Sequence, residues 1–172
     1  KNKLNTKLIA IREKELVKRA FEGFSKIDGI HILADNVKDR LGIFSFWTEH
    51  IHFNLIVKLL NDRYGIQVRG GCACAGTYGH FLLNVTPSES SAIVERISSG
   101  DLSVKPGFVR VSLHPTMTDD ELDYVIESIK SIIENHEEWG KEYEYSSNTN
   151  EFTHKTFDSE INDRIASWFD IE

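Results

Sequence analysis

Apolar residues recur at helical spacing in four stretches of this chain, and each stretch predicts a helix. Residues 8–27 and 52–64 each carry an apolar stripe between charged positions, and Gly65 follows the second as a C-terminal cap. Two further helices begin at capping boxes. Thr86-Pro87-Ser88-Glu89 opens one that should end near residue 98, and Thr118-Asp119-Asp120-Glu121 opens one that should end near residue 135.

Short runs with β-branched and aromatic residues predict strands between these helices. They cover residues 31–34, 42–47, 66–68 and 108–113, and residues 35–39 read as a turn. In the last strand Val109 and Val111 alternate with Arg110 and Ser112, which predicts one apolar and one polar face. The elements together predict an α+β fold: three or four short, mostly antiparallel strands, covered by helices on one face.

The totals narrow the class of protein. A chain of 172 residues, 40% hydrophobic and 27% charged, fits one soluble globular domain. No apolar run is long enough for a membrane span, and no signal peptide is visible at the start. Since the only methionine is Met117, we expect a piece of a longer protein. Two cysteines are too few for a disulfide scaffold, so we expect free thiols in a reducing, cytoplasmic setting.

The charge of −7 lies entirely in the tail. Residues 1–136 hold 17 acids and 17 bases, whereas residues 137–172 hold ten acids and three bases. No basic face of the kind that binds nucleic acid is expected. The tail is also aromatic, which argues against simple disorder. We therefore divide the chain into a domain at 1–136 and an acidic extension at 137–172. We expect the extension to pack onto the domain, and the alternative is an arm that binds a partner. Its end could form a last short helix, with one face made by Ile161, Ile165, Trp168 and Phe169.

The loop at 69–80 is the strongest candidate for a reactive site, because it holds both cysteines, four glycines and Arg69. A thiol reacts as its thiolate, and a nearby cation favours that form. A disulfide between Cys72 and Cys74 would be strained. With His80 the two thiols offer three zinc ligands, but structural zinc sites usually take four and space their cysteines more widely. We therefore predict no metal site.

Two segments carry a family resemblance: Tyr64-Gly65-Ile66-Gln67-Val68-Arg69-Gly70-Gly71-Cys72-Ala73-Cys74-Ala75, and Val109-Arg110-Val111-Ser112-Leu113-His114-Pro115-Thr116. With the acidic helix start that follows, they resemble the small C-terminal domain of class V, fold-type I pyridoxal-phosphate enzymes. The resemblance covers the first four-fifths of the chain and is nearest to the cysteine desulfurases and selenocysteine lyases. It implies that Cys74 accepts sulfur as a persulfide, that Arg110 holds the substrate carboxylate, and that Arg69 lies beside the active site.

The chain also departs from that pattern. Cys72 and Ala73 stand where many relatives have two histidines, Gly76-Thr77 replaces a proline, and His114-Pro115 replaces a Tyr-Asn pair. A class V aminotransferase or lyase without persulfide chemistry therefore stays open, and so does a non-enzymatic binding or metal-holding module. Cys72 could be a resolving thiol, a second acceptor or part of the loop's packing. His80 and His114 are further accessory candidates.

The cofactor lysine of the family has no counterpart here. His154-Lys155 is a His-Lys pair, but it lies in the tail, and we interpret it as coincidence. The resemblance therefore implies a small domain that is inactive alone. Its expected partners are a large domain that binds pyridoxal 5'-phosphate, a second subunit in a homodimer, and a small amino-acid substrate.

Overall fold

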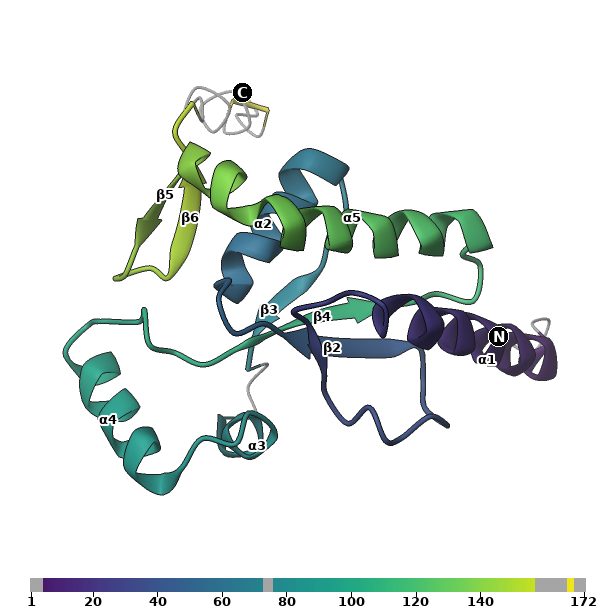
Figure 1. Cartoon of the computed structure of the whole chain (residues 1–172), viewed down its shortest axis with the longest axis horizontal. Coiled ribbons are helices and arrows are strands. Elements are labelled where there is room, and N and C mark those ends of the chain that lie inside the picture. Colours follow the sequence, from purple (N-terminus) through teal and green to yellow (C-terminus); the bar gives the residue numbers. More distant parts are fainter. Residues whose placement is uncertain (1–4, 73–75, 157–166, 169–172) are drawn as a thin grey trace.

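A four-stranded antiparallel sheet lies at the centre of the molecule (Figure 1). The computed structural model describes residues 5–72, 76–156 and 167–168. The strand order is β1-β2-β4-β3. The strands are β1 (His31–Ile32), β2 (Ile43–Trp47), β3 (Arg69–Gly71) and β4 (Phe108–Ser112). The helices are α1 (Thr6–Phe24), α2 (Phe53–Tyr64), α3 (Gly76–Leu82), α4 (Pro87–Ser98) and α5 (Asp119–Trp139).

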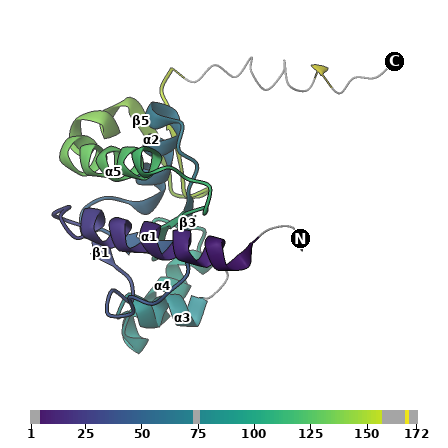
Figure 2. The same cartoon turned by 90° about the vertical axis from the view of Figure 1, so that its right-hand side faces the viewer.

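The hydrophobic core lies between one face of the sheet and α1, α2 and α5. Alternation along the strands sends Phe44 and Phe46 of β2, and Val109 and Val111 of β4, into this core. Each of these four side chains is at most 4% exposed. The predicted α+β class, with helices covering one face of an antiparallel sheet, is confirmed. Figures 1 and 2 place α3 and α4 on the side of the sheet away from α5.

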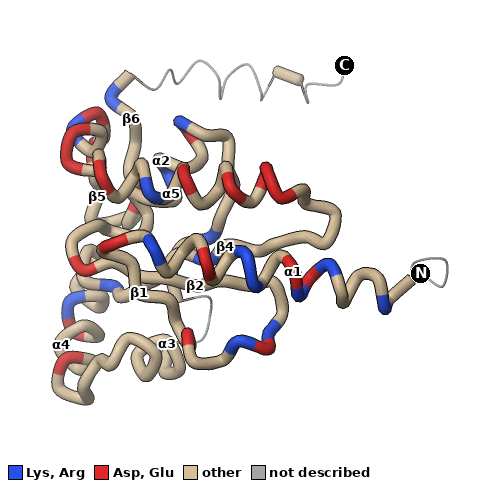
Figure 3. The backbone as a smooth tube through the Cα atoms, turned by 45° about the vertical axis from the view of Figure 1, so that its right-hand side comes forward, with Lys and Arg blue, Asp and Glu red and all other residues tan. Residues whose placement is uncertain are grey.

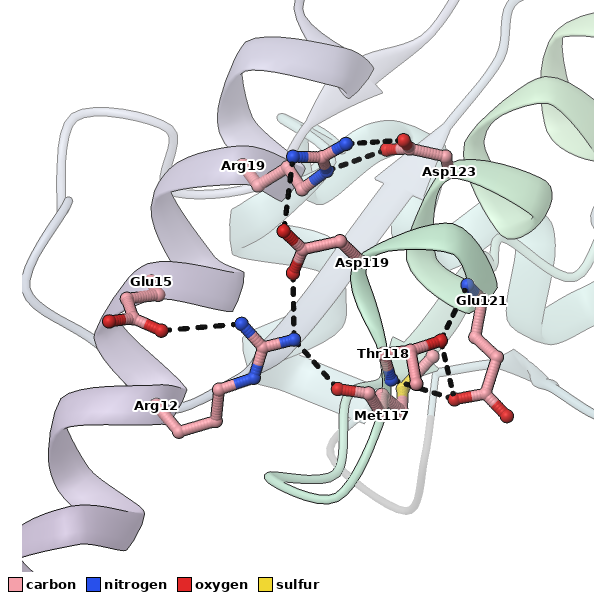
Figure 4. Close-up of polar contacts among 8 residues, drawn as sticks. All are labelled: Arg12, Glu15, Arg19, Met117, Thr118, Asp119, Glu121 and Asp123. Atoms are coloured by element: carbon pink, nitrogen blue, oxygen red, sulfur yellow. Dashed lines mark hydrogen bonds and ion pairs between the residues drawn. The ribbon is translucent and has the colours of Figure 1, made fainter.

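Ion pairs and a hydrogen bond join α1 to the start of α5, which opens with a capping box (Figure 4). Arg12 donates to Asp119 at 2.7 Å and to the carbonyl of Met117 at 2.8 Å, and Arg19 contacts both Asp119 and Asp123. Thr118 caps the helix through the reciprocal bonds with Glu121 that the sequence predicts. These contacts hold α1 against the segment that leads from β4 into α5.

The third strand is displaced from its predicted position, which was residues 66–68. The strand that pairs with β4 is Arg69–Gly71, three residues later. The amide of Ile66 donates to the carbonyl of Leu60, as part of the turn that ends α2. The strand therefore forms only from the residues that follow this turn.

The short helix α3 was also not predicted, because two glycines interrupt it. Helix α5 runs to Trp139, beyond the predicted end near residue 135.

The first part of the tail forms the hairpin β5 (Tyr143–Ser146) and β6 (Glu151–His154), after a 3-10 turn at Gly140–Glu142. This hairpin packs against α2: Asn54 donates to the carbonyl of Asn150 at 2.5 Å, and Arg63 pairs with Glu142 at 2.6 Å. The expectation that the extension packs onto the body is confirmed as far as residue 156. Ile161, Ile165 and Phe169 lie outside the described residues. No helix within the described ranges is long and apolar enough to cross a membrane.

Candidate functional site

Arg110 lies at the centre of the outer face of the sheet, opposite the core. Its Cα partners are Ser45 on β2 and Arg69 on β3. Paired residues of antiparallel strands point to the same face, so these three side chains share the outer face. The burial of Val109 and Val111 on the inner face fixes this orientation. The sequence prediction of two faces for this strand is confirmed.

A cleft of about 450 Å³ lies between this outer face, the connection from β1 to β2, and α3. Arg110 and Ser45 line it from the sheet, Arg40 from the connection, and Tyr78 from α3. Among the described residues that line it there is no Asp, Glu or Lys. The other lining residues are Leu33, Ala34, Leu41, Ile43, Cys72, Gly79, Leu82 and Phe108. The described lining of the cleft is therefore mostly apolar, with two arginines and no acidic residue.

The guanidinium of Arg110 is half-buried and has no hydrogen-bond or ion-pair partner within residues 5–72 and 76–156. The hydroxyl of Ser45 beside it likewise has none in those ranges. An anion from solution would give this unpaired guanidinium a charge-assisted hydrogen-bond partner. A planar guanidinium binds a carboxylate with two parallel hydrogen bonds. The arrangement is therefore suited to holding a carboxylate on the sheet.

Cys72 forms the junction between the cleft and α3. A Cβ added to Gly79 would lie 3.2 Å from both Cβ and Sγ of Cys72, so only glycine lets α3 approach this closely without displacing the cysteine. The Cys72 thiol donates to the carbonyl of Pro106 at 2.6 Å. Burial raises the pKa of this thiol, and Lys105 opposes the rise only in part. Cys72 is therefore held as a protonated thiol, which fits a packing role better than that of a nucleophile.

The remaining sequence candidates are placed as follows. Cys74 lies outside the described residues, two positions along the chain from Cys72. Arg69 is exposed and does not line the cleft, although its backbone pairs with that of Arg110. His80 bonds to Ser90 of α4 at 3.0 Å, and His114 bonds to Thr116 in its own turn at 2.7 Å. Neither histidine lines the cleft.

Most of the lining residues were not predicted as site residues, among them the polar residues Arg40, Ser45 and Tyr78. Ser45 carried a signal, because it is the single polar residue within an otherwise apolar strand. Arg40 carried none, since it stands among turn-forming residues. As to metals, no group of three His, Cys, Asp or Glu residues in the described part of the chain is arranged to hold an ion.

Comparison with known proteins gives this geometry a context. Residues 2–125 match the model of the family described as aminotransferase class-V. "Probable cysteine desulfurase 2" of Mycobacterium leprae is 32% identical over 100 residues, which cover 57% of this chain and 24% of that protein. Among solved structures, the apo form of a protein assigned as a sugar aminotransferase from Streptococcus pneumoniae aligns with a TM-score of 0.50 and 22% identity, over 77% of this chain and 32% of that one. The chain thus spans about a quarter to a third of the length of these two proteins. The similarity to the Streptococcus pneumoniae structure supports the fold.

Proposed function

The chain belongs to the class V aminotransferase family, and we propose that it is the small, substrate-binding domain of a pyridoxal-phosphate enzyme that takes sulfur from cysteine as a persulfide on Cys74. Its partners in this proposal are a large domain that binds the cofactor and a second subunit in a homodimer, in the cytoplasm. The match to a cysteine desulfurase of much greater length supports the reaction class and the need for a further domain.

The observation that carries the proposal is the unpaired guanidinium of Arg110 in the cleft. The side chain projects from the middle of a sheet strand whose neighbours on the other face are fully packed, so its backbone is rigid. A carboxylate bound there would be fixed in position and orientation relative to the sheet. Such fixed orientation of a substrate accounts for much of the rate that enzymes gain.

The described residues of the cleft fit the substrate's carboxylate and not the cofactor itself. No lysine lines the cleft to form the covalent link to pyridoxal phosphate, and no Asp or Glu is present to pair with its ring nitrogen. In our proposal both groups come from the large domain. This chain's contribution is to bind the carboxylate end, to line the cleft with apolar side chains such as Leu82 and Phe108, and to supply the sulfur acceptor.

The proposed acceptor step balances as follows. The Cys74 thiolate forms an S–S bond to the substrate sulfur while the C–S bond of the substrate breaks. The electron pair of that bond stays on the carbon fragment, which takes up a proton to become alanine. When bound, the cofactor supplies the electron sink that makes this carbon chemistry accessible. Because Cys72 is held as a protonated thiol, Cys74 is the better candidate for the reactive thiolate.

Transamination without a persulfide is the second candidate. The departures around Cys74 favour it, as Cys72 takes a place where many desulfurase-like relatives have a histidine. The two candidates differ in product, since desulfuration yields alanine and sulfide, whereas transamination yields a keto acid and no sulfide.

The test uses the chain expressed together with the proposed large domain. We expect the absorption band of bound pyridoxal phosphate and, with L-cysteine and a reductant, alanine and sulfide in equal amounts. Cys74→Ala should abolish sulfide release and leave the cofactor band intact, while the matched variant Cys72→Ala should keep sulfide release. Desulfuration retained by Cys74→Ala would refute the acceptor role. A complex without bound cofactor, with zinc found in the purified chain, would support the non-enzymatic module instead.

A further inference from the structure

Arg69 lies on the same outer face of the sheet as Arg110, directly opposite it on the neighbouring strand. The two residues are Cα partners in the antiparallel pairing of β3 with β4. Side chains of directly opposite residues share a face, with their Cβ atoms about 5 Å apart. Gly70, the next residue along β3, faces α2 on the inner side, because a Cβ there would lie 2.9 Å from side-chain atoms of Phe53 and Asn54. Alternation along the strand therefore sends Arg69 outward.

The guanidinium groups of Arg69 and Arg110 differ from those of the other described arginines because they have no partner. Neither makes a hydrogen bond, an ion pair or a ring contact with another residue in the described part of the chain. The described arginines that donate to an oxygen are Arg12, Arg19, Arg40, Arg63 and Arg96. The two unpartnered arginines are thus cross-strand neighbours, and their unpaired positive charge lies at one place on the sheet.

Among the described residues, no outward-facing position of the four strands is acidic. Besides the two arginines, these positions are His31, Ile43, Ser45, Trp47, Gly71, Phe108 and Ser112. Figure 3 shows that α3, which lies on this side of the sheet, has no Lys, Arg, Asp or Glu. Like charges directly opposite each other on neighbouring strands are destabilising. An anion that contacts both guanidinium groups would offset this repulsion.

The geometry of the pair favours one class of anion. A single guanidinium binds both oxygens of a carboxylate through two parallel hydrogen bonds, so Arg110 alone is enough to hold a carboxylate. The oxygens of a tetrahedral oxyanion point in different directions and can accept from two guanidinium groups that approach from different sides. Two negative charges also match the two positive charges, whereas a carboxylate compensates only one. The pair is therefore better suited to a dianion such as phosphate or sulfate.

We propose that Arg69 and Arg110 together bind one inorganic tetrahedral dianion, of the phosphate and sulfate class, on the outer face of the sheet. Binding needs neither the cofactor nor Cys74, so it is a property of this chain. The inference rests on the proposed function in one respect: because Arg110 is the proposed carboxylate site, the dianion competes with the substrate. Cysteine needs only Arg110, and Arg69 adds affinity for the dianion.

Sulfate and methyl sulfate are matched probes, because both are tetrahedral and they differ by one negative charge. NMR titration of the full, isotopically labelled chain gives both dissociation constants, measured at the Nε–H signals of the two arginines. The ionic strength is held constant, since salt screens exposed charges. We expect sulfate to bind about fivefold more tightly, the upper end of what one exposed ion pair contributes. Arg69→Gln should bring the ratio close to one, and Arg69→Lys should keep part of it.

Arg63→Gln is the matched control, because it removes an equal charge from α2, on the other side of the sheet. It should leave the ratio unchanged. Equal affinities of the two probes in the unaltered chain, no binding of sulfate, or a ratio that survives Arg69→Gln would each overturn the site. Equal shifts at Arg63 and at the two outer-face arginines would indicate charge screening and overturn it too. If Arg69→Gln fails to fold, Arg69→Lys decides the question, and an unchanged ratio there overturns the site.

Competition is measured separately, in the complex with the proposed large domain. Sulfate should raise the KM for L-cysteine without lowering kcat, and it should do so less in Arg69→Gln. Sulfate that binds the isolated chain but leaves KM unchanged would overturn the competition. Because the binding titration uses no thiol and no cofactor, its failure is distinguishable from failure of the Cys74 test.

Discussion

Replacing Arg110 tests the proposed carboxylate site most directly. Arg110→Gln keeps a polar side chain of similar length on the outer face of β4 and removes the charge. Since the guanidinium has no partner in the described ranges, the substitution breaks no bond within them, and we expect the fold to be retained. A hydrogen bond to a charged group is worth about 1.5–3 kcal/mol. Loss of one such interaction therefore predicts a decrease in kcat/KM for L-cysteine of about 10- to 200-fold.

The assay is steady-state sulfide release by the complex of this chain with the proposed large domain. Arg110→Lys should give an intermediate value, because an ammonium keeps the charge but cannot donate two parallel bonds. Arg63→Gln serves as control. It removes an arginine of α2 that pairs with Glu142 and does not line the cleft, and it should leave kcat/KM unchanged. Values for Arg110→Gln within threefold of the unaltered enzyme, with an unchanged unfolding curve, would refute the carboxylate role.

Three further predictions concern the isolated chain. In Cys74→Ser the remaining thiol, Cys72, should be alkylated more slowly at about pH 7.5 than a free cysteine derivative, because burial raises the pKa of Cys72; an equal rate would contradict its protonated state. His52 caps α2 by accepting from the amide of Asn54 at 3.1 Å, and burial lowers the pKa of His52 below 6.5. Since the folded state favours the neutral ring, its contribution to stability is complete above pH 6.5 and is lost as the pH falls through the lowered pKa. Urea unfolding should show this loss in the unaltered chain and a weaker one in His52→Asn, which keeps a capping oxygen; identical pH profiles would exclude His52 as the cause. Gly107→Ala should destabilise the fold by about 1–3 kcal/mol, because the added Cβ would lie 2.5 Å from a ring carbon of Phe53. Gly76→Ala, whose added Cβ would meet no atom of the described residues within 4 Å, should change stability by less than about 0.5 kcal/mol in thermal unfolding.

Local chemistry made much of the fold predictable. Gly65 takes the left-handed conformation (φ 66°) that a C-terminal cap requires, and both capping boxes form with their reciprocal bonds. These features depend on residues within one turn of each other, so a single sequence is enough to recognise them. The alternation in β4 was equally informative, because burial on one face has a period of two.

Features that depend on contacts between residues far apart in the sequence were harder to predict. The strand β3 consists of Arg69, Gly70 and Gly71, which have poor strand propensity. Gly70 is required because a Cβ there would lie 2.9 Å from side-chain atoms of both Phe53 and Asn54 on α2. The hairpin in the tail was missed for a similar reason. Its turn depends on Asn150 with φ of 60°, and that residue is held by bonds from Asn54 and Tyr145.

The two arginines that line the cleft are positioned by different kinds of contact, and this affects how the lining of the cleft can change through substitution. The outward position of Arg110 is a consequence of the inward burial of Val109 and Val111, since a slip of one residue would place the guanidinium in the core. The location of this charge is thus stabilised by the core and not by contacts within the cleft. Arg40, by contrast, is held by two carbonyls of a turn and two aromatic rings at the sheet edge. Substitutions in that turn can therefore alter the wall of the cleft that the β1–β2 connection forms without moving Arg110, so that the shape of the cleft can diverge while the position of this arginine stays fixed.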